Sequence, residues 1–390
     1  MIPAGGLLIN RSEVPKTVVI IQRVISHYRV PFFQRLQRRL GEMGVQLTVI
    51  YGQEDPGVSS TAVNLDEEWA KPVHNLYLSW PVGEAVWQPC LLPALRADLV
   101  VVEQAGRLLV NYPLLLLRAV KRFRLAFWGH GRNWQSPGRG GVAELIKSRM
   151  SCRVDWWFAY TERTAELLRV RGFADERITV VRNTVDTEEL ARGVSEVSEE
   201  DLSRCREGLA VRGDNIVLFC GGMYPSKRLD FLLDACRRIH ESLPDFTVIF
   251  IGSGSDQHLI EEAERLYPWV RYLGPVVGEA RAVYFRMAKA ILMPGLVGLA
   301  IIDSFAAGVP LVTTNLSIHS PEIAYLEPGT NGIMTTYDPS EFSRAVLDLL
   351  ASPEQQQALA AACRRSAADF SLDQMVERFA EGICKCLGSS

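Results

Sequence analysis

The chain has 390 residues, of which 48% are hydrophobic and 22% charged, and its formal net charge is −3. These values are typical of a soluble globular protein with room for two domains. The eight cysteines are scattered without a Cys-x-x-Cys pair, which argues against a zinc ribbon or a disulfide framework. No apolar run reaches the ~20 residues of a membrane span. We expect reduced thiols, no signal peptide and a cytoplasmic location.

Apolar strands alternate with helices along the first half. The β-branched run at 17–22 is typical of a strand buried on both faces of a parallel sheet, and a helix follows from Pro31. Residues 52–75 are polar and are predicted to form an active-site loop. The alternation predicts a doubly wound α/β sheet, in which ligands gather at the carboxyl ends of strands. Further strands are predicted at 46–51, 99–102, 124–128, 156–160 and 178–181.

The second half repeats this pattern after an acidic, polar segment at 187–214. Strands are predicted at 216–220, 247–251, 270–273 and 290–293. Two helices should follow over 339–368, separated at Ser352-Pro353. We therefore predict an N-terminal Rossmann-like domain over 1–190, a C-terminal one over 191–369, and a cleft between them. The terminal helix at 370–390 is predicted to pack back on the first domain.

The stretch at 287–314 carries the most functional information. A short apolar strand runs into Pro294-Gly295, Gly298 opens an apolar helix, and Gly308 closes it. Backbone N–H groups at such a helix start, together with the helix dipole, can bind an anion. Asp303 is the only charged side chain in this helix, so it needs a partner or an aqueous cleft. The alternative is an ordinary βαβ unit with Asp303 in solvent.

This stretch resembles the donor-site signature of glycosyltransferase family 4, whose members have the GT-B fold. The signature reads Pro-Ser-x-x-Glu, Gly-x-Gly-Leu, an apolar triplet, Glu-Ala and Gly-x-Pro. The resemblance implies that Asp303 stands for the second Glu, which meets the nucleotide ribose. Gly295 stands where the first Glu meets the donor sugar. It also implies that the connecting loop contacts the donor, through Gly295, Leu296, Val297, Gly298 and Leu299.

A glycine turn precedes a lysine in Gly221-Gly222-x-x-x-x-Lys227. Glycines let the backbone approach a phosphate, and a lysine adds a point charge. The segment resembles the family's Gly-Arg-x-x-x-x-Lys element, which holds the donor pyrophosphate. Gly222 replaces the Arg, and Arg228 is a possible substitute. The alternative is a solvated Lys-Arg pair at a helix start.

A second glycine turn, Gly252-Ser253-Gly254, also lies between a strand and a helix. It lacks the third glycine of a dinucleotide fingerprint, so an NAD site is disfavoured, and an ordinary tight turn is the alternative. The family resemblance places this turn near the nucleotide. It also implies that the base is held by the backbone of Gly274, Pro275 and Val276.

His130 lies between two glycines at a predicted strand end, which should leave its ring exposed. It resembles the family's strand-end His, close to the transferred sugar; a structural His is the alternative. The residues expected to face the acceptor lie after strands of the first half and are His27, Tyr28, Arg29, Glu103 and Arg132. Two further segments, Pro321-Glu322-Ile323 and Asn183-x-Val-Asp186, match family signatures.

Basic residues flank the strand at 124–128 on both sides, from Arg118 to Arg153. Because Trp134, Leu145 and Ile146 are interleaved with them, this stretch could rest on an anionic membrane or hold a pyrophosphate-lipid acceptor. Nucleic-acid binding is a competing use without a recognition motif, and a solvated helix face is another.

The resemblance implies a retaining glycosyltransferase that needs no metal or other cofactor. It would move a sugar from a UDP- or GDP-sugar to a glycan or polyprenyl-linked acceptor in cell-envelope or exopolysaccharide synthesis. Lys227, Asp303 and His130 would carry the reaction, with the charge on the leaving diphosphate stabilised by Lys227 and main-chain amides. The rivals are another GT-B enzyme, such as a sugar phosphorylase or nucleotide-sugar epimerase, and a non-catalytic nucleotide-sugar-binding relative.

Overall fold

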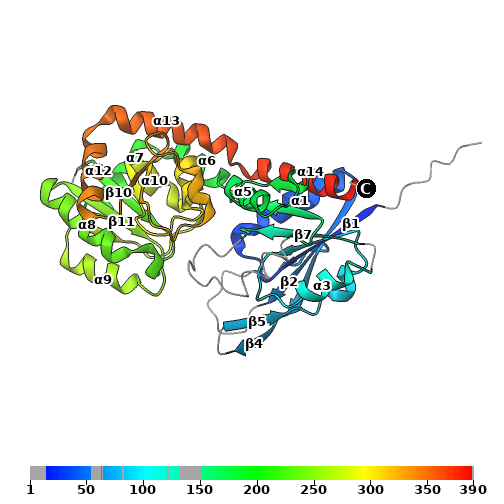
Figure 1. Ribbon diagram of the computed structural model, residues 1–390. Coiled ribbons are helices and arrows are strands. Elements are labelled where there is room, and N and C mark those ends of the chain that lie inside the picture. The colour runs from blue at the N-terminus through cyan, green and yellow to red at the C-terminus, as the bar shows by residue number, and fades with distance from the viewer. Residues whose placement is uncertain are drawn as a thin grey trace, which may run out of the picture. The chain divides into compact units, whose positions relative to one another are not determined.

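The computed structural model describes residues 15–53, 63, 65–80, 83–120, 123–131, 152–211 and 213–388. It contains two parallel α/β sheets, which confirms the predicted fold class (Figure 1). The chain divides into two compact units. Unit 1 comprises Met1–Phe127, Val154–Trp156 and Ala380–Ser390, and unit 2 comprises Trp128–Arg153 and Trp157–Phe379. The domain boundaries taken from composition stay a prediction.

The first sheet has the strand order β3-β2-β1-β6-β7-β8-β9. In the interior strand β1, Val18, Ile20 and Ile21 are buried and pair in parallel with both β2 and β6. The switch in strand order falls between β1 and β6, the place where open α/β sheets bind ligands. The strands are β1 (Lys16–Gln22), β2 (Val45–Gln53), β3 (Ala70–His74), β6 (Leu99–Glu103), β7 (Arg124–Gly129), β8 (Trp156–Ala159) and β9 (Ile178–Val180).

Helices and one hairpin connect these strands. The short turn η1 (His27–Arg29) leads into α1, whose buried face carries Phe32, Phe33 and Leu36, as its helical spacing predicts. Strands β4 (Leu76–Trp80) and β5 (Gly83–Trp87) form an antiparallel pair. The helices are α1 (Val30–Glu42), α2 (Leu91–Ala94), α3 (Asn111–Leu117) and α5 (Glu162–Val170), followed by η2 (Asp175–Arg177).

The second sheet has the order β12-β11-β10-β13-β14-β15, which is the Rossmann order with its switch between β10 and β13. All its pairings are parallel, so the strands end at one common edge. Leu218 and Phe219 of β10 and Ile249 and Phe250 of β11 are fully buried. The strands are β10 (Asn215–Cys220), β11 (Phe246–Ile251), β12 (Val270–Tyr272), β13 (Ala290–Leu292), β14 (Leu311–Thr314) and β15 (Gly332–Thr335).

Helices surround β10 and β11 in Figure 1. Two of them, α6 and α7, form from the acidic segment that the composition assigned to a connection, and α7 begins with a capping box at Ser198 and Asp201. The helices are α6 (Glu188–Glu196), α7 (Glu199–Gly208), α8 (Leu229–Ser242), α9 (Gln257–Leu266), α10 (Ala282–Met287), α11 (Ala300–Ala307), α12 (Pro339–Ala351), α13 (Pro353–Asp369) and α14 (Leu372–Gly388). Shorter turns are η3 (Pro225–Lys227), η4 (Gly278–Arg281) and η5 (Pro321–Tyr325).

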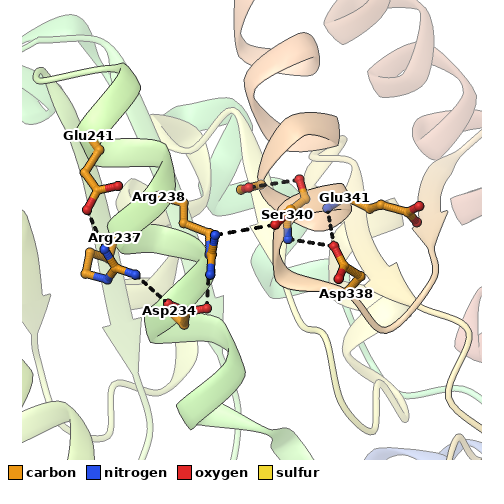
Figure 2. Close-up of polar contacts among 8 residues, drawn as sticks. Asp234, Arg237, Arg238, Glu241, Asp338, Ser340 and Glu341 are labelled. Carbon is orange, nitrogen blue, oxygen red and sulfur yellow. Dashed lines mark hydrogen bonds and ion pairs between the residues drawn. The ribbon is translucent and has the colours of Figure 1, made fainter.

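Helices α8 and α12 are joined by polar contacts at the surface, shown in Figure 2. Arg238 donates to Ser340 Oγ at 3.4 Å, and Asp234 pairs with Arg238 one helical turn away. Asp338 caps α12 by accepting from the backbone N–H groups of Ser340 and Glu341, each at 2.9 Å. Such exposed pairs contribute little stability, so this contact orients α12 more than it stabilises the domain.

The prediction of an irregular loop at 52–75 is wrong in part, because Ala70–His74 forms β3. Only Ala70 is buried in this strand, and Pro72 interrupts the apolar pattern. Proline is tolerated because β3 lies at the edge of the sheet, where one side of the backbone needs no partner. None of the described helices has the length and apolarity needed to cross a membrane.

Candidate donor site

Lys227 lies at the carboxyl edge of the second sheet, in the turn η3 before α8. Its side chain is 4% exposed, and Nζ donates to Leu296 O at 2.5 Å and contacts Met293 Sδ at 3.3 Å. The ammonium also lies over the Tyr224 ring, 5.6 Å from its centroid. Burial lowers the pKa of Lys227 to about 8. Because this buried ammonium is bonded to a neutral carbonyl and has lost its hydration, an anionic ligand would stabilise its charge.

Asp303 and Arg281 form an ion pair near the same strand end. Arg281 Nη1 donates to Asp303 Oδ2 at 3.0 Å, and the two side chains are 22% and 18% exposed. Cys220, the last residue of β10, lies among these charges. Burial raises the pKa of its thiol to about 11, Asp303 adds to the rise, and Arg281 and Lys227 oppose it. The structure thus brings Lys227 and Asp303 to one place.

We call Cys220, Lys227, Arg281 and Asp303 the donor cluster. Sequence reasoning missed Arg281 and Cys220. The one signal for Arg281 was Asp303, a single charge in an apolar helix, which needs a partner or an aqueous cleft. That signal does not tell where in the chain a cationic partner lies. The cluster carries two cations and one carboxylate, so it has one positive charge in excess.

The loop at 294–299 is held by hydrogen bonds to Thr314, at the end of β14, and to His319, which follows that strand. Val297 N donates to His319 Nδ1 at 3.3 Å, and His319 Nε2 donates to Thr314 O at 2.7 Å. Burial lowers the pKa of His319, so the ring is neutral with both nitrogens engaged. Thr314 Oγ1 in turn donates to Pro294 O at 2.6 Å. His319 therefore positions this loop, a role the sequence did not indicate.

Gly295 packs directly on the backbone of η3. A Cβ at this position would lie 2.2 Å from Ser226 O and 2.5 Å from Lys227 C, and Leu296 N donates to Ser226 O at 2.8 Å. The lysine turn and the loop thus touch main chain to main chain. A glutamate cannot enter here without moving one of them.

Restoring that glutamate should therefore damage the protein. Gly295→Glu and Gly295→Ala should each lower the free energy of unfolding by about 1–3 kcal/mol, because the loop must shift. Gly41→Ala is the matched control, since a Cβ there meets nothing within 4 Å and Gly41 lies inside α1. It should raise stability by about 0.5–1 kcal/mol. Chemical denaturation measures the free energy of unfolding of all three variants. If Gly295→Ala is as stable as the wild type, the packing argument is refuted.

The glycines after β10, β11 and β12 lie side by side. Gly252 has φ +137°, and a Cβ there would lie 1.9 Å from Gly221 O. Gly252 N donates to Gly274 O, and Gly221 N donates to Ile251 O, each at 2.9 Å. Gly254 is as tightly placed, with a Cβ position 2.1 Å from Met223 O. This close packing accounts for the Gly252-Ser253-Gly254 turn without a dinucleotide site.

Arg228 begins α8 in a left-handed conformation, φ 58°. Its guanidinium lies near Tyr337, where it counteracts the rise that burial causes in the pKa of that phenol. A Cβ on Gly222 would lie 2.5 Å from Tyr224 Cε1. The second cation that the described contacts place in the donor cluster is Arg281. The role of Arg228 as a substitute for the family's Arg stays a prediction.

Several residues expected at the acceptor side gather at the switch point of the first sheet. Glu103 Oε1 accepts from Arg23 N at 2.8 Å. Burial raises the pKa of Glu103, while Arg23, Arg107 and Arg29 act to lower it. Arg29 is 7% exposed and lies 5.3 Å from the centroid of the Tyr28 ring, which is 39% exposed. His27 and Tyr28 share the turn η1 with Arg29.

His130 follows β7 directly. Its ring packs edge-on against Tyr160, with centroids 4.2 Å apart, so it is half-buried rather than fully exposed. Gly131 has φ +73°, a conformation that favours glycine, and lets the chain turn there. Arg132 lies outside the described residues, as does most of the basic stretch. Arg118, at its start, pairs with Asp155.

The two remaining family signatures meet each other. Asn183 Nδ2 donates to Glu322 Oε1 at 2.7 Å, and both side chains are 2% exposed. Tyr325 Oη donates to the carbonyl oxygens of Asn183 and Tyr160, each at 3.2 Å. These segments therefore form a buried polar contact within unit 2, which is a structural role.

Comparison with known families agrees with this geometry. Residues 32–189 match the model described as Glycosyltransferase Family 4, and residues 214–352 match that described as Glycosyl transferases group 1. The chain belongs to glycosyltransferase family 4. The second match contains the whole donor cluster, and the first contains His130 and Glu103.

Curated relatives of this family 4 chain include two bacterial D-inositol 3-phosphate glycosyltransferases. The one from Jonesia denitrificans is 26% identical over 332 residues, which cover 81% of this chain and 72% of the relative. The one from Salinispora arenicola is 29% identical over 221 residues, which cover 53% of this chain. This match spans only 49%, about half, of the length of the Salinispora protein.

Solved structures show the fold. A glycosyltransferase from Rickettsia africae has a TM-score of 0.71 at 14% identity and covers 96% of this chain and 99% of its own. The Anabaena protein HepE, solved in complex with UDP, has a TM-score of 0.69 at 15% identity, with 95% and 99% covered. The family 4 chain therefore has the GT-B fold, with two Rossmann-like sheets.

Proposed function

We propose that this protein transfers a sugar from a nucleoside-diphosphate sugar to an acceptor with retention of the anomeric configuration. The observation that carries the proposal is the donor cluster at the switch point of the second sheet. Its excess positive charge lies where α/β sheets bind ligands, and it is buried, so an anion there would interact strongly.

The chemical task is to stabilise the charge that develops on the departing diphosphate. Lys227 would supply a preorganised cation, and the backbone N–H groups at the start of α11 would supply dipoles. Asp303 would accept hydrogen bonds from the ribose hydroxyls. The main chain at Gly274, Pro275 and Val276 would hold the base, and His130 would meet the donor sugar. In this mechanism the protein acts through electrostatic stabilisation and forms no covalent intermediate with the sugar.

The proposed reaction needs no metal ion, because Lys227 and the helix start neutralise the diphosphate. Treatment with EDTA should therefore leave turnover within about twofold of the untreated enzyme, measured by release of the nucleoside diphosphate. Addition of Mg²⁺ or Mn²⁺ after EDTA is the control. A loss of more than tenfold that either metal restores would contradict the metal-free proposal.

The acceptor would bind at the first sheet, near Glu103 and η1. Two relatives are named D-inositol 3-phosphate glycosyltransferase, and others are named phosphatidyl-myo-inositol mannosyltransferase. A polyol, free or on a lipid, is therefore the acceptor class to try first, followed by glycans and polyprenyl-linked sugars. Contact with an anionic membrane and a cytoplasmic location belong to the same proposal, as does a role in cell-envelope or exopolysaccharide synthesis.

The decisive experiment has two stages. Thermal shift with UDP, GDP and ADP identifies the base, and a transfer assay with the matching sugar nucleotides and acceptors follows. NMR of the product reports whether the anomeric configuration is retained. Binding without transfer or donor hydrolysis would favour a non-catalytic relative, the reading that Gly295 and Gly222 support by removing two charged donor contacts. No stabilisation by any of the three nucleotides would refute the donor site.

A further inference from the structure

The ion pair between Arg281 and Asp303 joins two elements across the donor cluster. Arg281 ends η4, and Asp303 lies in the first turn of α11, 22 residues further along the chain. Both side chains are mostly buried. Burying such a pair gains little stability, because desolvation offsets the attraction between the charges. A reason for the pair other than stability is therefore worth seeking.

The Arg281 side chain is enclosed by its neighbours. Its guanidinium lies 5.8 Å from the centroid of the Phe285 ring, and its charge acts to lower the pKa of the nearby Cys220 thiol. Its Nε is buried and has no hydrogen-bond partner among the described residues. An arginine held in this way is poorly placed to swing toward a ligand. Its charge acts instead on the carboxylate that it already contacts.

The Asp303 carboxylate is engaged on one side only. Oδ2 accepts from Arg281, and no described residue donates to Oδ1. Burial raises the pKa of Asp303, and Arg281 opposes that rise. A carboxylate must be ionised to make strong, charge-assisted hydrogen bonds with hydroxyl groups. Asp303 therefore depends on its partner for both its orientation and its charge.

We propose that Arg281 is a positioning residue that makes the donor site selective for nucleotides with a ribose diol. It holds Asp303 ionised and leaves Oδ1 to accept hydrogen bonds from the vicinal hydroxyls. This inference rests on the proposed function, in which Asp303 meets the ribose. It adds a residue outside the family signature on which that contact depends.

The test measures affinities for UDP and 2′,3′-dideoxy-UDP by calorimetry, or for the GDP or ADP pair if the wild type prefers that base. In Arg281→Met the ratio of the two affinities, ribonucleotide over dideoxy analogue, should fall roughly tenfold, the loss of one charge-assisted hydrogen bond, because the lost positive charge affects the diphosphate of both ligands alike. Arg281→Lys keeps the charge and should retain most of the preference.

Arg192→Met provides the matched control. It removes an exposed pair between Arg192 and Glu279, which lies in the same η4 turn as Arg281. Both affinities should stay at the wild-type values. If Arg281→Met is unfolded by circular dichroism, Arg281→Gln, which removes the charge and keeps a hydrogen-bond donor, replaces it with the same expected results.

Two outcomes would overturn the inference and leave the proposed function standing. One is an equal loss of both ligands in Arg281→Met, which marks a purely structural pair. The other is full retention of the ribonucleotide affinity in Arg281→Met. A wild type without a ribose preference would overturn the inference together with the ribose contact proposed for Asp303. If the wild type binds none of the nucleoside diphosphates, the proposed function itself fails, and the two failures are thereby distinguished.

Discussion

Lys227→Met should reduce turnover with the sugar-nucleotide donor about 100- to 1,000-fold, the ~2–4 kcal/mol that a preorganised charge contributes at a developing anion. Methionine keeps the length and removes the charge, so the cluster loses its excess cation. Folding should survive, because replacing a buried charge by an apolar side chain of similar volume is often neutral or stabilising. Steady-state kinetics and thermal unfolding measure the two effects separately.

Lys289→Met is the control for this variant. Lys289 immediately precedes β13 of the same sheet, and its Nζ donates to Asn215 Oδ1 at 3.0 Å, at the start of β10. It therefore lies at the amino edge of the sheet, away from the donor cluster. Turnover should stay within about twofold of the wild type, as for a surface substitution away from the site. Unchanged turnover in Lys227→Met, with the fold intact, would remove Lys227 from the mechanism.

The affinity for a nucleoside diphosphate should fall about tenfold for each pH unit above pH 8. Burial lowers the pKa of Lys227 to about 8 in the free protein. A bound diphosphate favours the charged ammonium and raises that pKa. Binding above pH 8 therefore takes up a proton, and affinity declines until the pKa of the complex is passed.

Neighbouring groups do not titrate in the same interval. Burial lowers the pKa of His319, so its ring is already neutral, and burial raises the pKa of the Cys220 thiol to about 11. Burial also raises the pKa of Tyr224. Calorimetry between pH 7.5 and about 9.5, in two buffers of different ionisation enthalpy, measures affinity and proton uptake together. A flat wild-type profile, or the same slope in Lys227→Met, would contradict the assignment.

Local patterns were sufficient to predict the fold. The apolar run of β1, the glycine that ends α11 at Gly308 and the break at Ser352-Pro353 are signals contained within a few residues. Because each strand of a parallel sheet is buried on both faces, its sequence is recognisable without its neighbours. The edge strands β3 and β15 were not predicted, whereas β9 and β12, which end the sheets on the other side, have apolar runs that were recognised.

The individual members of the candidate site were predicted less completely. Lys227 and Asp303 each follow a strand or begin a helix in a recognisable motif, and both lie in the donor cluster. Arg281 and His319 belong to no motif, and each acts through a contact with a segment about 22 residues away. Sequence spacing contains no information about such contacts, since the path of the chain between the two segments sets them.

The glycines show most clearly the difference between what local sequence predicts and what contacts between distant segments determine. A glycine-rich pattern in the chain indicated turns, because glycine is the residue that adopts positive φ without strain. The reason for Gly295 is different: its neighbour is the main chain of Ser226 and Lys227, which η3 brings within 2.2 Å of a Cβ position. Hydrophobic periodicity and turn residues were enough to identify two α/β domains and a glycine turn of the kind that binds phosphate. Which charges share one strand end, and which position has no room for a side chain, followed from the packing of distant segments against each other.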